Sequence, residues 1–217
     1  MSDSRQQLLD SLVADLAPVR PPPSVTRLSL LWLVGACAWV AAMTWLMGPL
    51  RPGVGEQLLH YPRFLFETVL GFTALSGAAV LLFRSALPGS SSRAALRLVL
   101  ALLGLWLASF LFGLVSPALE PGMHGKRPHC IFETYAYALP PLLVALYWLQ
   151  RLYPLRPAVS AALAGLVAGL LPAWYMQIAC MYEPLHILSL HILPGLSVAL
   201  LALPLMRYLP LLRNHTR

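Results

Sequence analysis

Long apolar segments alternate along the chain with short segments rich in proline, glycine, serine and arginine. A helix needs about 20 apolar residues, within a range of roughly 17 to 25, to cross the hydrocarbon layer of a membrane. Six segments fall in that range: residues 28–49, 64–83, 98–115, 131–149, 158–179 and 185–206. Because backbone groups in lipid must be hydrogen-bonded within their own segment, we expect each to be helical. The pattern predicts an all-α membrane protein, a bundle of six transmembrane helices.

The same pattern divides the chain into three parts. Residues 1–27 form a tail with a proline-rich spacer, residues 28–206 the transmembrane domain, and residues 207–217 a short C-terminal tail. Within the fifth segment, Gly165 and Gly169 are spaced as a pair of small residues four apart. Such pairs let helix backbones approach one another in membranes, so we expect another helix to pack closely there.

The composition of the 217 residues agrees with a membrane protein, since 59% are hydrophobic and only 11% are charged. Soluble domains are typically about half apolar and about a quarter charged. The composition therefore excludes an ordinary soluble enzyme, a disordered chain and a coiled coil. The net charge is +7, and in a membrane protein such an excess reports orientation rather than binding to nucleic acid. We expect contact with the lipid bilayer and none with nucleic acid.

The distribution of basic residues predicts the orientation. An even number of spans places both termini on one side, together with the second and fourth loops. The opposite side carries only Arg51, Arg63, Lys126 and Arg127. Cytoplasmic loops are enriched in lysine and arginine, so both termini are predicted to be cytoplasmic. The basic residues on the side of the termini are Arg5, Arg20, Arg27, Arg84, Arg93, Arg97, Arg151, Arg156, Arg207, Arg213 and Arg217.

Two segments at the opposite, outer face share a pattern of cysteine, any residue, aromatic residue and glutamate, at residues 130–133 and 180–183. In a helical turn, a cysteine and a glutamate three residues apart share a face. Histidines stand near both cysteines in the sequence, and His191 lies more than a turn deeper in the sixth segment. The candidate sensing residues are Cys130, Cys180, His124, His129, Glu133, Glu183 and His186.

Thiolate, imidazole and carboxylate groups that converge from two loops have the chemistry of a metal site. Soft sulfur ligands favour copper(I) or zinc over magnesium or calcium. The same two cysteines in an oxidising compartment could instead form a structural disulfide, and loop histidines are often simply solvated. No obligatory cofactor is expected. Glu67 and Glu133 lie within apolar segments, where ionisable groups are usually functional or paired; Arg63, four residues before Glu67, is a simple partner for it.

The N-terminal tail carries an amphipathic pattern over residues 4–16. A helix this short is marginal alone in water, so its apolar face needs a partner. A helix that lies on anionic lipid has a basic polar face, whereas this one carries Asp10 and Asp15 with only Arg5 opposing them. The pattern favours a protein groove as the partner, with a leader resting on the membrane as the alternative. The apolar stripe is Leu8, Leu9, Leu12, Val13 and Leu16.

The tail LLDSLVADLAPVRPPP, the six spans, the outer His129-Cys130-x-x-Glu133 and a second outer cysteine, Cys180, together resemble the negative regulator of sigma F family. Its members are anti-sigma factors of the bacterial inner membrane. The resemblance implies that the cytoplasmic tail sequesters an extracytoplasmic-function sigma factor. It also implies that periplasmic stress, from a thiophilic metal or an oxidant, acts at Cys130 and Cys180 and releases the sigma factor. No enzymatic activity is expected.

Two other classes of function compete with this interpretation. A membrane thiol oxidoreductase would relay electrons between Cys130, Cys180 and a quinone, but the chain has no Cys-x-x-Cys motif of the kind such enzymes commonly use. A small metal or proton transporter would need ionisable residues along a path through the membrane. The middles of the six segments are almost entirely leucine, alanine, valine and glycine, which disfavours a pore.

Overall fold

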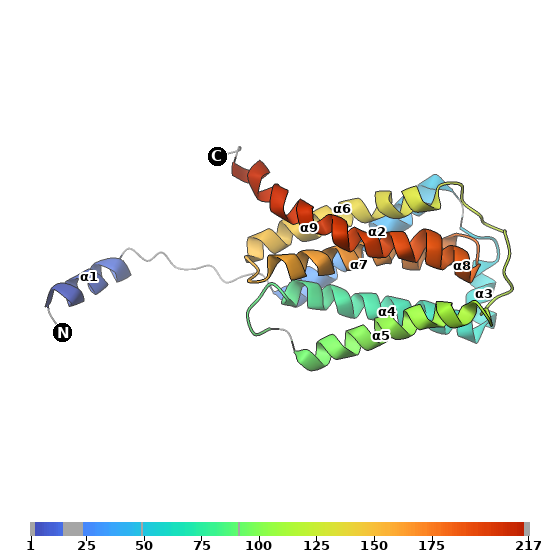
Figure 1. The fold of residues 1–217 in the computed structure, drawn as a ribbon, viewed down its shortest axis with the longest axis horizontal. Helices are drawn as coiled ribbons and strands as arrows, with labels where there is room; N and C mark the ends of the chain where they lie inside the picture. The colour runs from blue at the N-terminus through green and yellow to red at the C-terminus, as the bar shows by residue number, and fades with distance from the viewer. Residues whose placement is uncertain (1–2, 15–23, 49, 91, 215–217) are drawn as a thin grey trace.

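The computed structural model describes residues 3–14, 24–48, 50–90 and 92–214, and these residues form helices without a strand (Figure 1). Leu16 and Asp15 of the predicted tail helix lie outside the described residues. The elements are α1 (Asp3–Ala14), α2 (Val25–Met47), α3 (Val54–His60), α4 (Pro62–Arg84), α5 (Arg93–Gly113), α6 (Cys130–Leu152), α7 (Pro157–Ala179), α8 (Pro184–Ile187), the π-helical turn η1 (Leu188–Ile192) and α9 (Leu193–Asn214).

Six of the described helical segments are long and apolar enough to cross a membrane, which confirms the predicted fold class. The sixth runs from Pro184 to Tyr208 and joins α8, η1 and α9. The third begins earlier than predicted, because the side chain of Ser92 accepts a hydrogen bond from the backbone N–H of Ala94 (3.2 Å) and caps α5 ahead of its arginines. The seven-residue helix α3 was not predicted, and none of its residues is buried.

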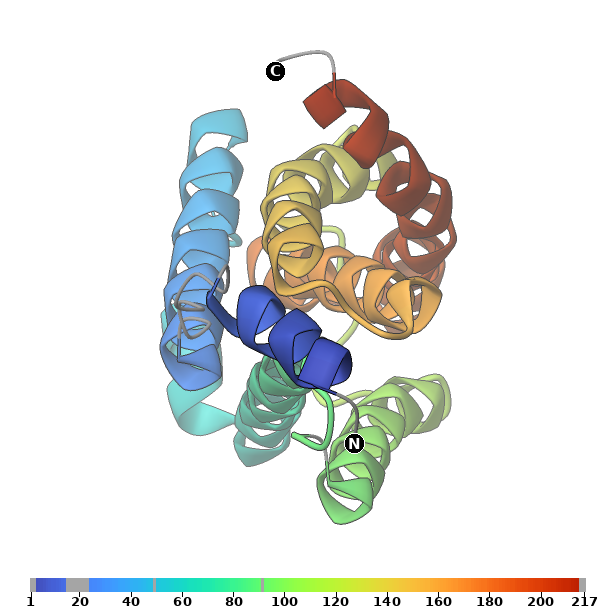
Figure 2. The ribbon, with the colours of Figure 1, turned by 90° about the vertical axis from the view of Figure 1, so that its left-hand side faces the viewer.

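The helix α7 lies at the centre of the bundle and contacts α2, α4, α6 and α9. Two thirds of its span (67%) is buried, against 22% for the peripheral α5. Figure 2 views the bundle from the α1 end and shows α6, α7 and α9 grouped together, with α2 on one side and α4 and α5 below.

The predicted close packing at the glycine pair of α7 is confirmed, and the partner is α9. A Cβ atom on Gly165 would lie 2.5 Å from the carbonyl oxygen of Val198. A Cβ atom on Gly169 would collide with the carbonyl oxygen of Gly195. Both positions therefore accept only glycine at this helix separation, which fixes α7 against α9.

A tryptophan of α2 compensates for Pro141 inside α6, and a second binds the carbonyl of that proline. Pro141 has no N–H, so the carbonyl oxygen of Tyr137, four residues earlier, loses its helical partner. The indole nitrogen of Trp39 donates to that oxygen (3.2 Å), and the indole nitrogen of Trp32 donates to the carbonyl oxygen of Pro141 (2.9 Å). Neighbouring helices restore hydrogen bonds in this way where prolines interrupt membrane helices.

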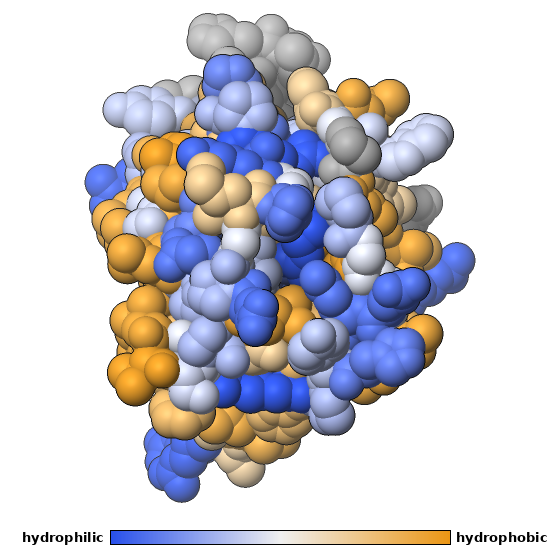
Figure 3. Space-filling model, turned by 90° about the vertical axis from the view of Figure 1, so that its right-hand side faces the viewer, coloured by the Kyte–Doolittle hydropathy of each residue, from blue (hydrophilic) through white to orange (hydrophobic). Residues whose placement is uncertain are grey.

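The two ends of the bundle differ in character. The helix α1 and the C-terminal part of α9 lie at one end, whereas α3, α8 and the start of α6 lie at the other (Figure 1). Figure 3 shows hydrophilic residues gathered over this second end, with hydrophobic residues on the flanks. The start of α2 and the C-terminal part of α9 therefore lie at the same end of the bundle.

Candidate functional site

The two outer cysteines meet inside the protein. Cys130 is the first residue of α6, and Cys180 directly follows the last residue of α7. Their sulfur atoms lie 3.6 Å apart, and both residues are buried, with 4% and 0% of their surface exposed. A disulfide bond is about 2.05 Å long, so the two side chains are separate thiols in this structure.

Two histidines complete a cluster around these sulfurs. The Nε2 atom of His186, on α8, lies 3.5 Å from the sulfur of Cys130 and 3.5 Å from that of Cys180. The ring of His191, on η1, lies 5.1 Å from the ring of His186, measured between centroids. One ligand atom from each of the four residues lies within 4.8 Å of every other. We call these four residues the Cys₂His₂ cluster.

The position of His191 depends on the π-helical turn. In a regular α-helix, residues five apart point about 140° away from each other, so His186 and His191 would face different directions. In η1 the N–H of Leu193 donates to the carbonyl oxygen of Leu188, five residues back, which widens the turn. Pro194 follows directly, and its ring would clash in a regular turn. Such π-helical turns often lie at functional sites.

A buried arginine ties the Cys180 segment to the end of α2. Arg51 donates from Nη1 to the carbonyl oxygens of Gln177 (3.1 Å) and Cys180 (2.9 Å), and from Nε to the side chain of Gln57 (3.0 Å). Its guanidinium also lies 5.2 Å from the ring centroid of Phe64. Burial lowers the pKa of Arg51 to about 10, which leaves it protonated at neutral pH. The cation caps the unpaired carbonyls at the end of α7.

A second buried arginine ties Cys130 to the same end of α2. The thiol of Cys130 donates to the backbone carbonyl of Arg127 (3.3 Å). The guanidinium of Arg127 donates to the last carbonyl oxygens of α2, those of Thr44 (2.7 Å) and Gly48 (2.9 Å), and pairs with Glu133 at 3.1 Å. Arg127 thus connects Cys130 to the C-terminal end of α2, and Arg51, in the loop that follows α2, holds the Cys180 segment.

The two thiols are not equivalent. The contact with the sulfur of Cys130, 3.6 Å away, is the largest cause that lowers the pKa of Cys180 below that of an ordinary thiol, with smaller contributions from His186 and His191. Burial opposes these effects but does not outweigh them. The lowered pKa favours the thiolate at Cys180, which is both the nucleophilic form and the metal-binding form of cysteine.

Only three of the predicted sensing residues belong to the cluster: Cys130, Cys180 and His186. His124 and His129 are exposed and lie outside it. Glu133 forms the ion pair with Arg127, and Glu183 caps α8 by accepting hydrogen bonds from the backbone N–H groups of Leu185 and His186. In this structure the two carboxylates make these structural contacts, and the two histidines are exposed outside the cluster.

Glu67 is also accounted for by its partners. Its carboxylate lies 3.4 Å from the Nε atom of Arg63, which confirms the predicted pair, and it accepts a hydrogen bond from the hydroxyl of Tyr182 (3.1 Å). That hydroxyl also accepts from the backbone N–H of Ala118 (3.1 Å). Because Tyr182 is two residues from Cys180, this network positions the Cys180 segment on its other side.

The tail helix exposes the predicted apolar stripe at the opposite end of the molecule. Leu8, Leu9, Leu12 and Val13 are 59%, 44%, 57% and 63% exposed, and Asp10 on the polar face is also exposed. Apolar side chains this exposed on one face of a helix are typical of a surface that binds a partner.

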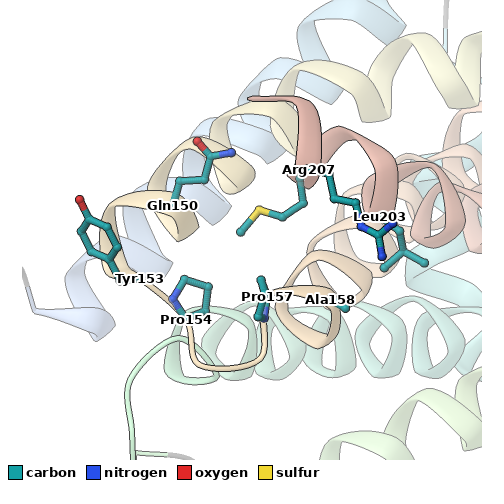
Figure 4. Close-up of a pocket in the computed structure, with 8 residues that line it drawn as sticks. Gln150, Tyr153, Pro154, Pro157, Ala158, Leu203 and Arg207 are labelled. Carbon is teal, nitrogen blue, oxygen red and sulfur yellow. The ribbon is translucent and has the colours of Figure 1, made fainter. Parts of the chain in front are cut away.

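A pocket of about 640 Å³ lies at the same end as the tail helix, between the ends of α6, α7 and α9 (Figure 4). Gln150, Tyr153 and Pro154 line one side of it, and Leu203 and Arg207 the other. Of the described residues that line it, Arg207 alone is charged. Cysteine and histidine side chains are brought together in the Cys₂His₂ cluster and not among the described residues of this pocket.

A comparison with known protein families identifies the family of the chain. The family described as negative regulator of sigma F matches residues 12–211, from the last turn of α1 through nearly all of α9. No curated protein and no solved structure matches the chain. Because the match covers nearly the whole chain, the protein belongs to the negative regulator of sigma F family.

Proposed function

We propose that this protein is a membrane anti-sigma factor that holds an extracytoplasmic-function sigma factor through α1. A metal or an oxidant acting on Cys130 and Cys180 releases that sigma factor. The observation that carries the proposal is the buried contact between two sulfur atoms from separate helices, 3.6 Å apart, at the end of the bundle opposite the exposed tail helix.

The charge distribution supports the orientation that this function requires. The arginines concentrate on the side of both termini, which supports a cytoplasmic α1 and periplasmic cysteines in a bacterial inner membrane. A cytoplasmic α1 can reach a sigma factor, and periplasmic thiols can meet metals and oxidants before these enter the cell.

The tail helix binds its partner as an amphipathic helix in a groove. Leu8, Leu9, Leu12 and Val13 form one apolar stripe, and Asp10 lies on the polar face. A 12-residue helix is marginally stable alone in water, so the energy that orders it comes from the bound partner. The sigma factor is then released when α1 unfolds or when its apolar stripe is no longer accessible to the sigma factor.

Two arginines provide the physical route from the sulfurs to the tail. Arg51 binds the carbonyl oxygen of Cys180, and Arg127, whose carbonyl accepts from the Cys130 thiol, binds the last carbonyls of α2. The helix α2 leads back to α1 along the chain. A shift of either cysteine therefore changes how the outer end of α2 is held, and packed helices respond to such shifts by changing between discrete arrangements.

Either stimulus changes the bonding of the cysteine pair. A two-electron oxidant that takes the protons and electrons of both thiols leaves a disulfide, which brings the sulfurs from 3.6 Å to about 2.05 Å. A metal ion instead replaces the thiol protons and fixes both sulfurs at its own bond lengths. The signal shifts the equilibrium by the difference in its affinity for the two arrangements.

Co-purification of a sigma factor tests the role of α1. We expect Leu9→Glu with Leu12→Glu to abolish co-purification, because two charges enter the apolar stripe. The matched control is Gln7→Glu with Ser11→Glu, which adds the same charge to the opposite face of the same helix and leaves binding intact. Equal loss in both variants, or retention in both, would show that the apolar stripe does not hold the partner.

A further inference from the structure

We propose that the Cys₂His₂ cluster is a closed tetrahedral site for a thiophilic divalent cation of the zinc class, with His191 as its fourth ligand. This inference rests on the proposed function and deepens it, since it names the ion, the ligand set and the coordination geometry. It assigns no ligand role to His129, the histidine adjacent to Cys130 in sequence.

The distances between the ligand atoms already match a tetrahedron. With Zn–S bonds of about 2.3 Å and Zn–N bonds of about 2.0 Å, tetrahedral angles separate two sulfurs by about 3.8 Å and a sulfur from a nitrogen by about 3.5 Å. The observed S–S separation is 3.6 Å, and both S–Nε2 separations to His186 are 3.5 Å. A linear ion bound by the two thiolates alone would need the sulfurs about 4.6 Å apart.

The fourth position is marked by an unpaired buried nitrogen. His191 has none of its surface exposed, and its Nε2 atom has no hydrogen-bond partner in the part of the chain that the structure describes. Leaving such a polar group unpaired in the interior costs about 1–3 kcal/mol. Its other nitrogen, Nδ1, lies 3.4 Å from the hydroxyl of Thr134. Metal-binding histidines use their second nitrogen in this way, which orients the ring.

Charge and burial favour a divalent ion. Two thiolates and two neutral imidazoles carry a charge of −2 together, so a divalent cation makes the buried site neutral, whereas copper(I) would leave one negative charge. All four ligands come from the protein, and His186 is the most exposed of them at 8%. Four protein ligands fill the positions of a tetrahedron. Closed sites of this composition hold zinc, whereas catalytic sites keep one position open.

The site is tested on purified full-length protein in detergent, titrated with Zn²⁺ and with Co²⁺ as a spectroscopic substitute. X-ray absorption of the zinc form is expected to show two sulfurs at about 2.3 Å and two nitrogens at about 2.0 Å. The cobalt form is expected to show the intense visible bands of tetrahedral coordination and a thiolate charge-transfer band. Coordination by sulfur alone, or an octahedral cobalt spectrum, would overturn the proposal.

The decisive variant is His191→Gln, with His129→Gln as the matched control. We expect His191→Gln to weaken Zn²⁺ binding by at least about 10-fold, and His129→Gln to leave it unchanged. Circular dichroism checks that both variants are folded, and the spectra of the unaltered protein decide the question if His191→Gln does not fold. Equal affinity in the two variants, or tight copper(I) binding that is indifferent to His191, would overturn the assignment.

Binding of the ion and release of the partner are read separately. Zn²⁺ binding in the expected geometry without sigma factor release would contradict the proposed trigger and leave the site in place. Release by an oxidant from a protein that binds no divalent ion would support the proposed function and overturn the site.

Discussion

Arg51 donates a 2.9 Å hydrogen bond to the backbone carbonyl of Cys180, although the two residues are 129 positions apart in the chain. The same nitrogen of Arg51 holds the carbonyl oxygen of Gln177, so one cation closes the end of α7. Arg51 follows α2, and Cys180 lies in the Cys₂His₂ cluster. The position of the sulfur and the position of α2 are therefore physically linked.

Substitution of Arg51 tests this link. Arg51→Met keeps the volume of the side chain but leaves the carbonyls of Cys180 and Gln177 without their donor, at a cost of about 1–3 kcal/mol for each buried group. We expect a lower melting temperature and a sigma factor response that no longer follows metal addition. Arg51→Lys retains a positive charge and part of the hydrogen bonding. Its melting temperature and its response to metal should lie between those of the unaltered protein and those of Arg51→Met. A normal response in Arg51→Met would remove Arg51 from the route.

Replacement of the cysteines separates sensing from binding. We expect Cys130→Ser and Cys180→Ser to keep the sigma factor bound in the presence of metal or oxidant. Each variant has lost one of the two sulfurs, so it can form neither the disulfide nor the metal site. Cys37→Ser is the control, since Cys37 lies within α2 and outside the cluster. A reporter gene driven by the sigma factor provides the measurement. Normal induction in both outer cysteine variants would contradict the account.

The pH dependence of the thiolate follows from the contact between the cysteines. That contact lowers the pKa of Cys180, so its charged form persists below the pH at which ordinary thiols are protonated, and is lost only as the pH falls through the lowered pKa. Cys130→Ala removes the contact and should shift the titration upward, whereas Cys130→Ser retains a hydroxyl donor. The ultraviolet absorbance of the thiolate, followed against pH in metal-free protein, measures the titration in each variant. Identical titrations in the two variants would show that this contact does not lower the pKa of Cys180.

The glycine contact between α7 and α9 predicts a sharp asymmetry among glycines. Gly169→Ala forces a methyl group into the carbonyl oxygen of Gly195, and we expect a loss of about 1–3 kcal/mol in stability. Gly104→Ala, in α5, meets nothing within 4 Å and should be neutral or slightly stabilising. Thermal unfolding in detergent compares them, and similar melting temperatures would argue against close packing at Gly169.

Much of this arrangement could be predicted from the sequence. Hydrophobic runs determine membrane helices almost alone, so the six spans were correctly predicted, as was the close approach at Gly165 and Gly169. The sequence also selected Cys130, Cys180 and His186, because residues at the same ends of membrane helices are confined to one thin layer.

The rest depends on tertiary structure that no local pattern encodes. The role of His191 follows from a π-helical turn that rotates it onto the face of His186. Spacing places Glu133 and Glu183 near the cysteines. Only the fold shows that Glu133 forms an ion pair with Arg127 and that Glu183 caps the start of α8. The one sequence feature that points to His191 is its spacing of five residues from His186, just before Pro194. That spacing indicates a shared site only when the intervening turn is known to be π-helical.

The central claim is that a change at the outer sulfurs releases a partner from α1 at the other end of the bundle. Energy transfer between a labelled α1 and a labelled sigma factor, in membrane vesicles whose outer face is the periplasmic one, measures this directly. Addition of Zn²⁺ or an impermeant oxidant outside should reduce transfer in the unaltered protein and leave it unchanged in Cys130→Ser with Cys180→Ser. A signal that falls equally in both proteins, or in neither, would contradict the account.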